Sequence, residues 1–75
     1  MQAYRDIDGN SGVAAFESRE RSLIVTFKTG GAYLYDYRKP GRRHVEAMKK
    51  HALRGNGLAT YINQHVRDNY SAKLG

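Results

Sequence analysis

The sequence predicts an α+β fold, in which a three-stranded antiparallel meander is followed by two helices packed on one sheet face, a β-β-β-α-α two-layer sandwich. Residues 11–37 contain three short segments rich in β-branched and aromatic residues, with turn residues between them. After this stretch the apolar spacing changes from two to about 3.6 residues. A Gly-Asn-Gly sequence at residues 55–57 then separates two helical segments. At 75 residues, the chain has room for one domain with a small core.

The domain organisation follows from where these patterns begin and end. Residues 1–10 mix polar, charged and glycine positions without an apolar period, so we expect a loose N-terminal lead-in there. Residues 11–70 hold the predicted domain, and residues 71–75 are expected to form a C-terminal tail. The chain contains no internal repeat and no linker that would indicate a second unit.

The three strands are predicted at residues 11–17, 22–28 and 32–37. A three-residue turn between the second and third strands places Leu23 opposite Tyr37. One face of the sheet then collects the predicted core residues Ala14, Phe16, Leu23, Val25, Phe27, Tyr33, Tyr35 and Tyr37. The tyrosines of this face are therefore expected to be buried or half-buried, not to form an open platform for stacking bases.

The opposite sheet face is more apolar than a solvated face usually is. Its apolar members are Val13, Ala15, Ile24 and Leu34. Exposed apolar patches of this kind commonly mark protein contacts. This face is therefore the alternative functional surface, for protein–protein interaction or homodimerisation.

The two helices are predicted at residues 40–53 and 58–70, with Pro40 in the first turn of the first helix. Their core faces are formed by Val45, Met48 and Ala52 in the first helix and by Leu58, Ile62, Val66 and Tyr70 in the second. Two amphipathic helices and one apolar sheet face can bury one another, which completes the predicted sandwich.

The net charge of +6 falls almost entirely on one segment. Residues 38–54 carry seven basic side chains against Glu46 alone, a balance of +6, whereas residues 1–37 carry −1 and residues 55–75 carry +1. Basic side chains on one flank of a helix can neutralise phosphates and release counterions. The candidate nucleic-acid-binding residues are Arg38, Lys39, Arg42, Arg43, Lys49, Lys50 and Arg54, with Arg67 nearby. An acidic protein partner and a merely solubilising helix face are the alternatives.

Two spaced motifs point to a known family. One is L-x-V-x-F-x-x-G-x-x-Y-x-Y, which starts at Leu23, and the other is Y-I-N-x-x-V-R-x-x-Y, which starts at Tyr61. Together they resemble the KTSC domain, a small module found at the C-terminus of some lysyl-tRNA synthetases and as a free-standing protein. The resemblance covers about residues 11–70, and the doubled glycine of the loop at 55–57 departs from the family pattern. The association with a tRNA-charging enzyme implies RNA, in preference to DNA, as the ligand.

The sequence offers no starting point for catalysis, because it has no cysteine, no paired carboxylates, no Ser-His-acid pattern and no phosphate-binding glycine loop. So small a sandwich is also expected to lack a typical ligand pocket of roughly 300–1,000 Å³. We therefore expect a binding protein and not an enzyme, with no cofactor. His44 and His51 share a helix face but lack a third ligand, so no metal site is predicted. The absence of cysteine and of a long apolar run predicts a cytoplasmic protein without a membrane anchor.

Overall fold

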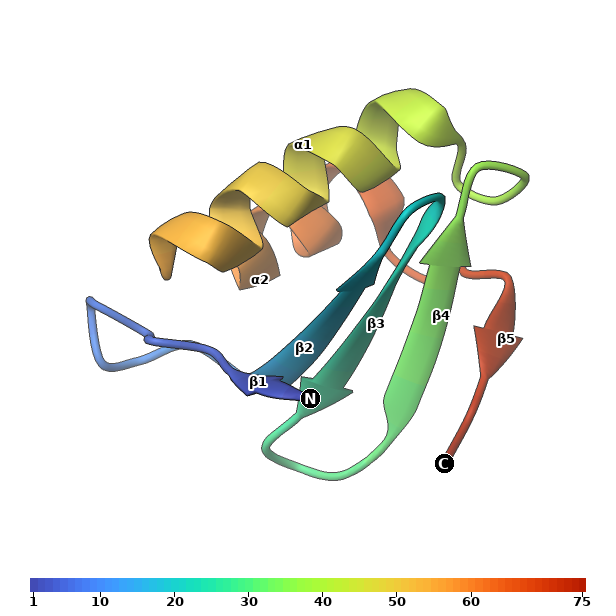
Figure 1. Cartoon of the computed structure of the whole chain (residues 1–75). Helices are drawn as coiled ribbons and strands as arrows, with labels where there is room; N and C mark the ends of the chain where they lie inside the picture. The colour runs from blue at the N-terminus through green and yellow to red at the C-terminus, as the bar shows by residue number, and fades with distance from the viewer.

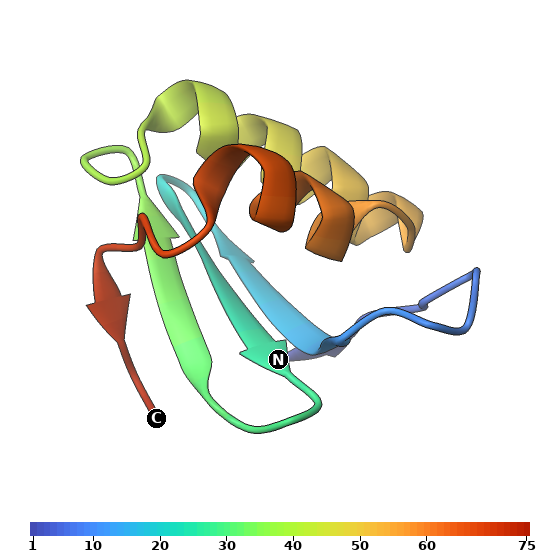
Figure 2. The same cartoon turned by 180° about the vertical axis from the view of Figure 1, so that it is seen from behind.

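A five-stranded antiparallel sheet, in the order β1-β2-β3-β4-β5, forms one layer of the computed structural model, which describes residues 1–75 (Figure 1). The strands are β1 (Gln2–Ala3), β2 (Val13–Arg19), β3 (Ser22–Phe27), β4 (Ala32–Asp36) and β5 (Ala72–Lys73). The second layer consists of helix α1 (Arg42–Arg54), helix α2 (Leu58–Tyr61) and the π-helical turn η1 (Ile62–Val66). Seen from behind, α2 and η1 run alongside α1 on the same face of the sheet (Figure 2). The α+β class, the antiparallel sheet and the two helices are confirmed.

The sheet has five strands where three were predicted, because both ends of the chain add a short edge strand. Tyr4 fixes the N-terminal end, since its side chain is buried and its backbone N–H donates to the Ala14 carbonyl at 3.0 Å. At the other end, the Ser71 N–H donates to the Leu34 carbonyl at 2.7 Å. Strands of two residues are too short to show the alternation by which a sequence reveals a strand.

The register between β3 and β4 differs by two residues from the predicted one. Leu23 lies opposite Tyr35 and not opposite Tyr37. The connecting loop is longer than expected, since the last pair before it joins Thr26 to Ala32. Because side chains alternate along a strand, a shift of two residues leaves each side chain on its predicted face.

Val13 lies in the core, so its predicted place on the outer sheet face is wrong. The reason is a β-bulge in β2, where Val13 pairs with Phe27 but Ala15 already pairs with Thr26. Ala14 is the extra residue, and it reverses the alternation on its N-terminal side. Val13 therefore turns toward the helices and is 0% exposed, whereas Ala14, predicted for the core, is half-buried.

The core lies between the sheet and the helices, as the apolar pattern predicted. It consists of Tyr4, Val13, Phe16, Leu23, Val25, Tyr35, Val45, Met48, Ala52, Leu58, Ile62 and Val66. Tyr33 and Tyr37 are partly buried and pack against it, which confirms the expectation for the strand tyrosines. Burial raises the pKa of Tyr35 to about 12, because the phenolate would be charged in an apolar setting.

The C-terminal end of α1 is closed by the N-terminal segment of the chain. Gly55 follows the helix in the left-handed conformation, with φ of 82°. A Cβ atom at this position would lie 2.7 Å from Cβ of Arg5. The Arg5 guanidinium donates to the carbonyl oxygens of Leu53 and Arg54, at 3.2 and 2.8 Å, and so satisfies groups that the last turn leaves unpaired.

The helices have different bounds from the predicted ones. Helix α1 begins at Arg42, after Gly41 as the N-cap residue, and not at Pro40. The second helical segment ends at η1, so Tyr70 lies beyond it and packs against the core from the following loop. The chain leaves η1 at Arg67, whose φ is positive. Neither helical segment combines the length and the apolar character that crossing a bilayer requires.

Candidate functional site

The outward face of α1 carries three exposed cations, Arg43, Lys50 and Arg54. Their spacing of seven and four residues places them on one face of the helix, opposite the buried Val45 and Met48. None of the three takes part in an ion pair. We call these three residues the outer α1 face. It is the part of the predicted cationic set that the structure brings into one row.

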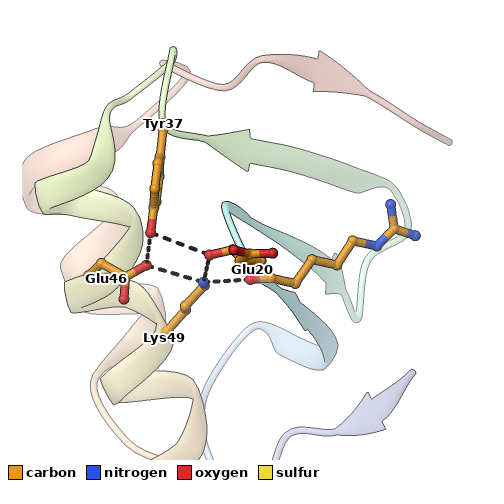
Figure 3. Close-up of polar contacts among 5 residues, drawn as sticks. Glu20, Tyr37, Glu46 and Lys49 are labelled. Atoms are coloured by element: carbon orange, nitrogen blue, oxygen red, sulfur yellow. Dashed lines mark hydrogen bonds and ion pairs between the residues drawn. The ribbon is translucent and has the colours of Figure 1, made fainter.

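Lys49 does not belong to this face, although the sequence grouped it with the other cations. Its side chain is 13% exposed, and its ammonium group forms an ion pair with Glu46 at 3.1 Å. The same ammonium group donates to the carbonyl oxygens of Arg19 and Glu20, at 2.5 and 3.0 Å (Figure 3). Lys49 therefore ties α1 to the hairpin of β2 and β3, and has no donor left that is directed only at solvent.

Tyr37 completes this tether from the loop after β4. Its hydroxyl donates to Glu46 at 2.8 Å, as Figure 3 shows. This hydrogen bond, with the Lys49 ammonium as a second donor, lowers the pKa of the Glu46 carboxyl. The carboxylate in turn raises the pKa of Tyr37, because a phenolate could not donate this bond and would be repelled. Glu46, the one acid of the basic segment, is thus already engaged.

A second group of cations meets beside the start of α1. Arg21 from the β2–β3 turn, Arg38 from the loop after β4, and Arg42 line an open cleft of about 630 Å³. The Arg42 guanidinium lies 5.9 Å from the centre of the Tyr37 ring, within range of a cation–π contact. Lys39 is exposed in the same loop as Arg38. We call this site the arginine cleft.

Arg21 was not predicted, because it lies outside the basic segment of the sequence. The fold brings it to the cleft by placing the β2–β3 turn next to the end of β4, where the Tyr37 N–H donates to the Arg21 carbonyl at 3.3 Å. The sequence contained one signal for this placement. Arg21 is a basic residue in a predicted hairpin turn, and that turn faces the start of the basic segment.

Two acids also line the arginine cleft, and they differ in availability. The Asp36 carboxylate accepts the N–H groups of Arg38 and Lys39, each at 3.0 Å. Desolvation acts to raise the pKa of Asp36, but hydrogen bonds from Ser71 and from these two N–H groups outweigh it and lower the pKa. Asp36 is therefore committed to the loop, which leaves Glu20 as the acid that can oppose three arginines.

Arg67 is separated from the other predicted cations. It lines a different open cleft, of about 680 Å³, between η1 and strands β3 and β4, and no residue of α1 lines that cleft. The expectation that so small a protein lacks room for a ligand is therefore wrong. Four open clefts, of about 680, 630, 370 and 370 Å³, fall within the usual size range of ligand sites.

The three histidines gather around Tyr61 at the junction of the two helical segments. His44 Nδ1 lies 2.8 Å from the Tyr61 hydroxyl oxygen, and the Tyr61 ring centre lies 5.3 Å from that of His51 and 4.7 Å from that of His65. The sequence had placed only His44 and His51 together, on one helix face. No group of three or more potential ligands is arranged to hold a metal ion.

The outer sheet face is free of helices, since both helical segments lie on the other side (Figure 1). Ile24 is 6% exposed there, and Ala15 and Leu34 are half-buried. Val13, predicted for this face, has moved to the core. The remaining apolar patch is therefore smaller than the sequence indicated.

Comparison with known proteins found no relative of this chain. A scan against protein-family models, a search of curated proteins and a search of solved structures each found no match. The residues and their geometry therefore carry the functional argument.

Proposed function

We propose that the protein is a small basic binding module that binds RNA non-specifically. The surface is the outer α1 face together with the arginine cleft and its loop, formed by Arg21, Arg38, Lys39, Arg42, Arg43, Lys50 and Arg54. The observation that carries the proposal is that these side chains are exposed and none of them forms an ion pair.

Glu20 is the one uncommitted acid beside this surface, and it cannot neutralise seven cations. Asp6 pairs with Lys28 at 2.8 Å, and Glu17 forms an ion pair with Arg19, so neither acid pairs with a cation of this surface. Glu46, on α1 itself, is engaged by the tether described above. Free cations next to one another attract a polyanion, and binding releases its counterions, whichever bases the polyanion carries.

The choice of RNA over DNA rests on the resemblance to the KTSC domain and on its association with lysyl-tRNA synthetases. The structure adds one feature that suits a flexible strand, since Tyr37 stands among the arginines of the cleft with its ring next to Arg42. A base or a phosphate of a single strand can approach such a site more readily than a base held within a duplex.

The test is a binding titration by fluorescence anisotropy with a labelled single-stranded RNA and a matched DNA. We expect Lys50→Glu to weaken RNA binding by about tenfold, because a phosphate contact becomes a repulsion. Lys73→Glu is the matched control, since it makes the same charge change on β5, at the far edge of the sheet (Figure 1). Equal losses in the two variants, or no RNA binding by the unaltered protein, would remove the proposal.

Homodimerisation through the outer sheet face is the second candidate. It is favoured by the absence of any helix over this face and by the half-buried Leu34, which lies opposite the buried Ile24. Analytical ultracentrifugation tests it. The dimer hypothesis expects Leu34→Lys to convert a dimer into a folded monomer, and a protein that is already monomeric at high concentration contradicts it.

A further inference from the structure

The cleft that holds Arg67 has aromatic walls and a polar rim. Its floor and walls include Phe27, Tyr33, Tyr35 and Tyr70, and its rim includes Asn63 and Arg67. The Tyr33 ring centre lies 4.7 Å from that of Tyr70 and 5.6 Å from that of Phe27, so the rings form one continuous cluster. We call this site the aromatic cleft.

Residues distant in the sequence build the aromatic cleft. Strands β3 and β4 and the loop between them supply Phe27, Gly30 and Tyr33, and the η1 segment and the loop after it supply Asn63 and Tyr70. The two spaced motifs of the sequence therefore meet at this one place. The cleft that these residues line is open to solvent and has a volume of about 680 Å³.

Arg67 occupies a backbone conformation that is unfavourable for a residue with a side chain. Its φ of 52° and ψ of −120° lie outside the small left-handed region that L-residues tolerate, where ψ is about +30 to +60°. The chain uses glycine at six other positions with positive φ. Residues held in sparsely populated conformations cluster at functional sites, where the side chain is needed in spite of the strain.

The fold itself makes little use of the Arg67 side chain. Its one hydrogen bond within the protein is from Nε to the Asn63 carbonyl, at 3.2 Å and exposed to solvent. The other non-glycine residue with positive φ, Asp6, is different, because its carboxylate accepts the Ser11 N–H and pairs with Lys28. A structural reason thus exists for Asp6, whereas the remaining guanidinium donors of Arg67 have no partner in the chain.

We propose that the aromatic cleft binds a small molecule in which a planar aromatic ring is joined to an anionic group. The ring packs against Tyr33 and its aromatic neighbours, and the anion accepts hydrogen bonds from the Arg67 guanidinium, a geometry that suits phosphate and carboxylate alike. The Asn63 side-chain amide makes no hydrogen bond within the protein and is free to contact polar edges of the ring. Asp68, on the rim, offers an acceptor for an N–H donor of the ring. This site is independent of the proposed RNA surface, because no α1 residue lines it.

The experiment is an amide-shift titration of isotope-labelled protein with four probes. Adenosine 5′-monophosphate and indole-3-acetate each join a ring to an anion, adenosine has the ring alone, and ribose 5-phosphate has the anion alone. We expect both joined probes to shift the amides of Gly30, Tyr33 and Asn63, and adenosine monophosphate to bind about tenfold more tightly than adenosine or ribose 5-phosphate. Binding of adenosine monophosphate shows that the site accepts a phosphate, and binding of indole-3-acetate shows that it accepts a carboxylate.

Two variants separate the role of Arg67 from folding. Arg67→Gly removes the guanidinium and relieves the backbone, so we expect a protein that is folded and not less stable but binds adenosine monophosphate about tenfold more weakly. Its affinity for adenosine should not change. Arg67→Lys keeps the charge and should recover part of the lost affinity, since a lysine cannot form the two parallel hydrogen bonds of arginine.

Three results would overturn the proposal. The first is that neither joined probe shifts the cleft amides, the second is that the shifts fall on α1 instead, and the third is that Arg67→Gly binds adenosine monophosphate as tightly as the unaltered protein does. Because the probes are too small to span the outer α1 face, failure here leaves the RNA proposal untouched. Loss of RNA binding in Lys50→Glu, conversely, says nothing about the aromatic cleft.

Discussion

Helix α1 and the α2–η1 segment each end at a residue with positive φ. That residue is glycine after α1 and arginine after η1. The regular helix α1 ends at Gly55, which adopts its φ of 82° without cost, and it exposes a row of unpaired cations. The irregular segment passes through a π-helical turn and ends at Arg67, which is strained. Where the turn serves the fold alone, glycine is present. Where an arginine occupies a strained position, a role of its side chain accounts for its presence. The Arg67 side chain lines an open cleft.

The largest effect is expected at the end of α1. Gly55→Ala should lower the free energy of unfolding by about 2 kcal/mol or more, because alanine resists the left-handed conformation and its Cβ would meet Cβ of Arg5 at 2.7 Å. Denaturant unfolding measures it. Gly9→Ala is the control, since Gly9 has a similar φ of 77° but nothing within 4 Å of the added Cβ. Equal losses would show that contact with the N-terminal segment plays no part.

A smaller effect of opposite sign is expected at the end of η1. Arg67→Gly should raise the free energy of unfolding by about 1 kcal/mol, as relief of strain exceeds the greater entropy of glycine in the unfolded chain. Chemical denaturation of the two proteins side by side provides the value. A loss of stability would mean that the arginine supports the fold, and the contrast between the two helix ends would disappear.

The smallest effect concerns the tether between α1 and the β2–β3 hairpin. The folded-state pKa of Glu46 lies below its ordinary value of 4.5, so its contribution to stability is complete above that pH and is lost as the pH falls through the folded pKa. We expect Glu46→Gln to make the stability less dependent on pH in this acidic range. Melting temperatures measured across the range test this, and an unchanged pH profile would mean that the Tyr37 and Lys49 contacts do not stabilise the charged carboxylate.

The same contrast explains how much of the molecule the sequence could predict. The buried stripe of α1 and its outward cations follow a regular period, so Val45, Met48, Arg43 and Lys50 fall where the pattern placed them. Lys49 follows the same period, but its contacts come from the hairpin, which no helical pattern reveals. The helical period of a sequence predicts which side chains share a face of the helix. It does not predict which other parts of the fold contact that face.

The remaining differences arise where the backbone departs from a regular period. The bulge at Ala14 moved Val13 into the core, and the π-helical turn ends at the strained Arg67, which lines the aromatic cleft. Tertiary contacts also brought Arg21 to the arginine cleft and Tyr4 into the core. Each of these depends on contacts between distant parts of the chain, which a local reading of one sequence does not contain.

The central claim, that the exposed cations of α1 bind the phosphates of RNA, is tested most directly by the salt dependence of the affinity. For a single strand, each phosphate contact contributes about −0.7 to the slope of log K against log salt concentration. We expect Arg43→Ala combined with Lys50→Ala to make the slope shallower by about 1.4, whereas Lys73→Ala leaves it unchanged. The same slope in all three proteins would contradict the claim.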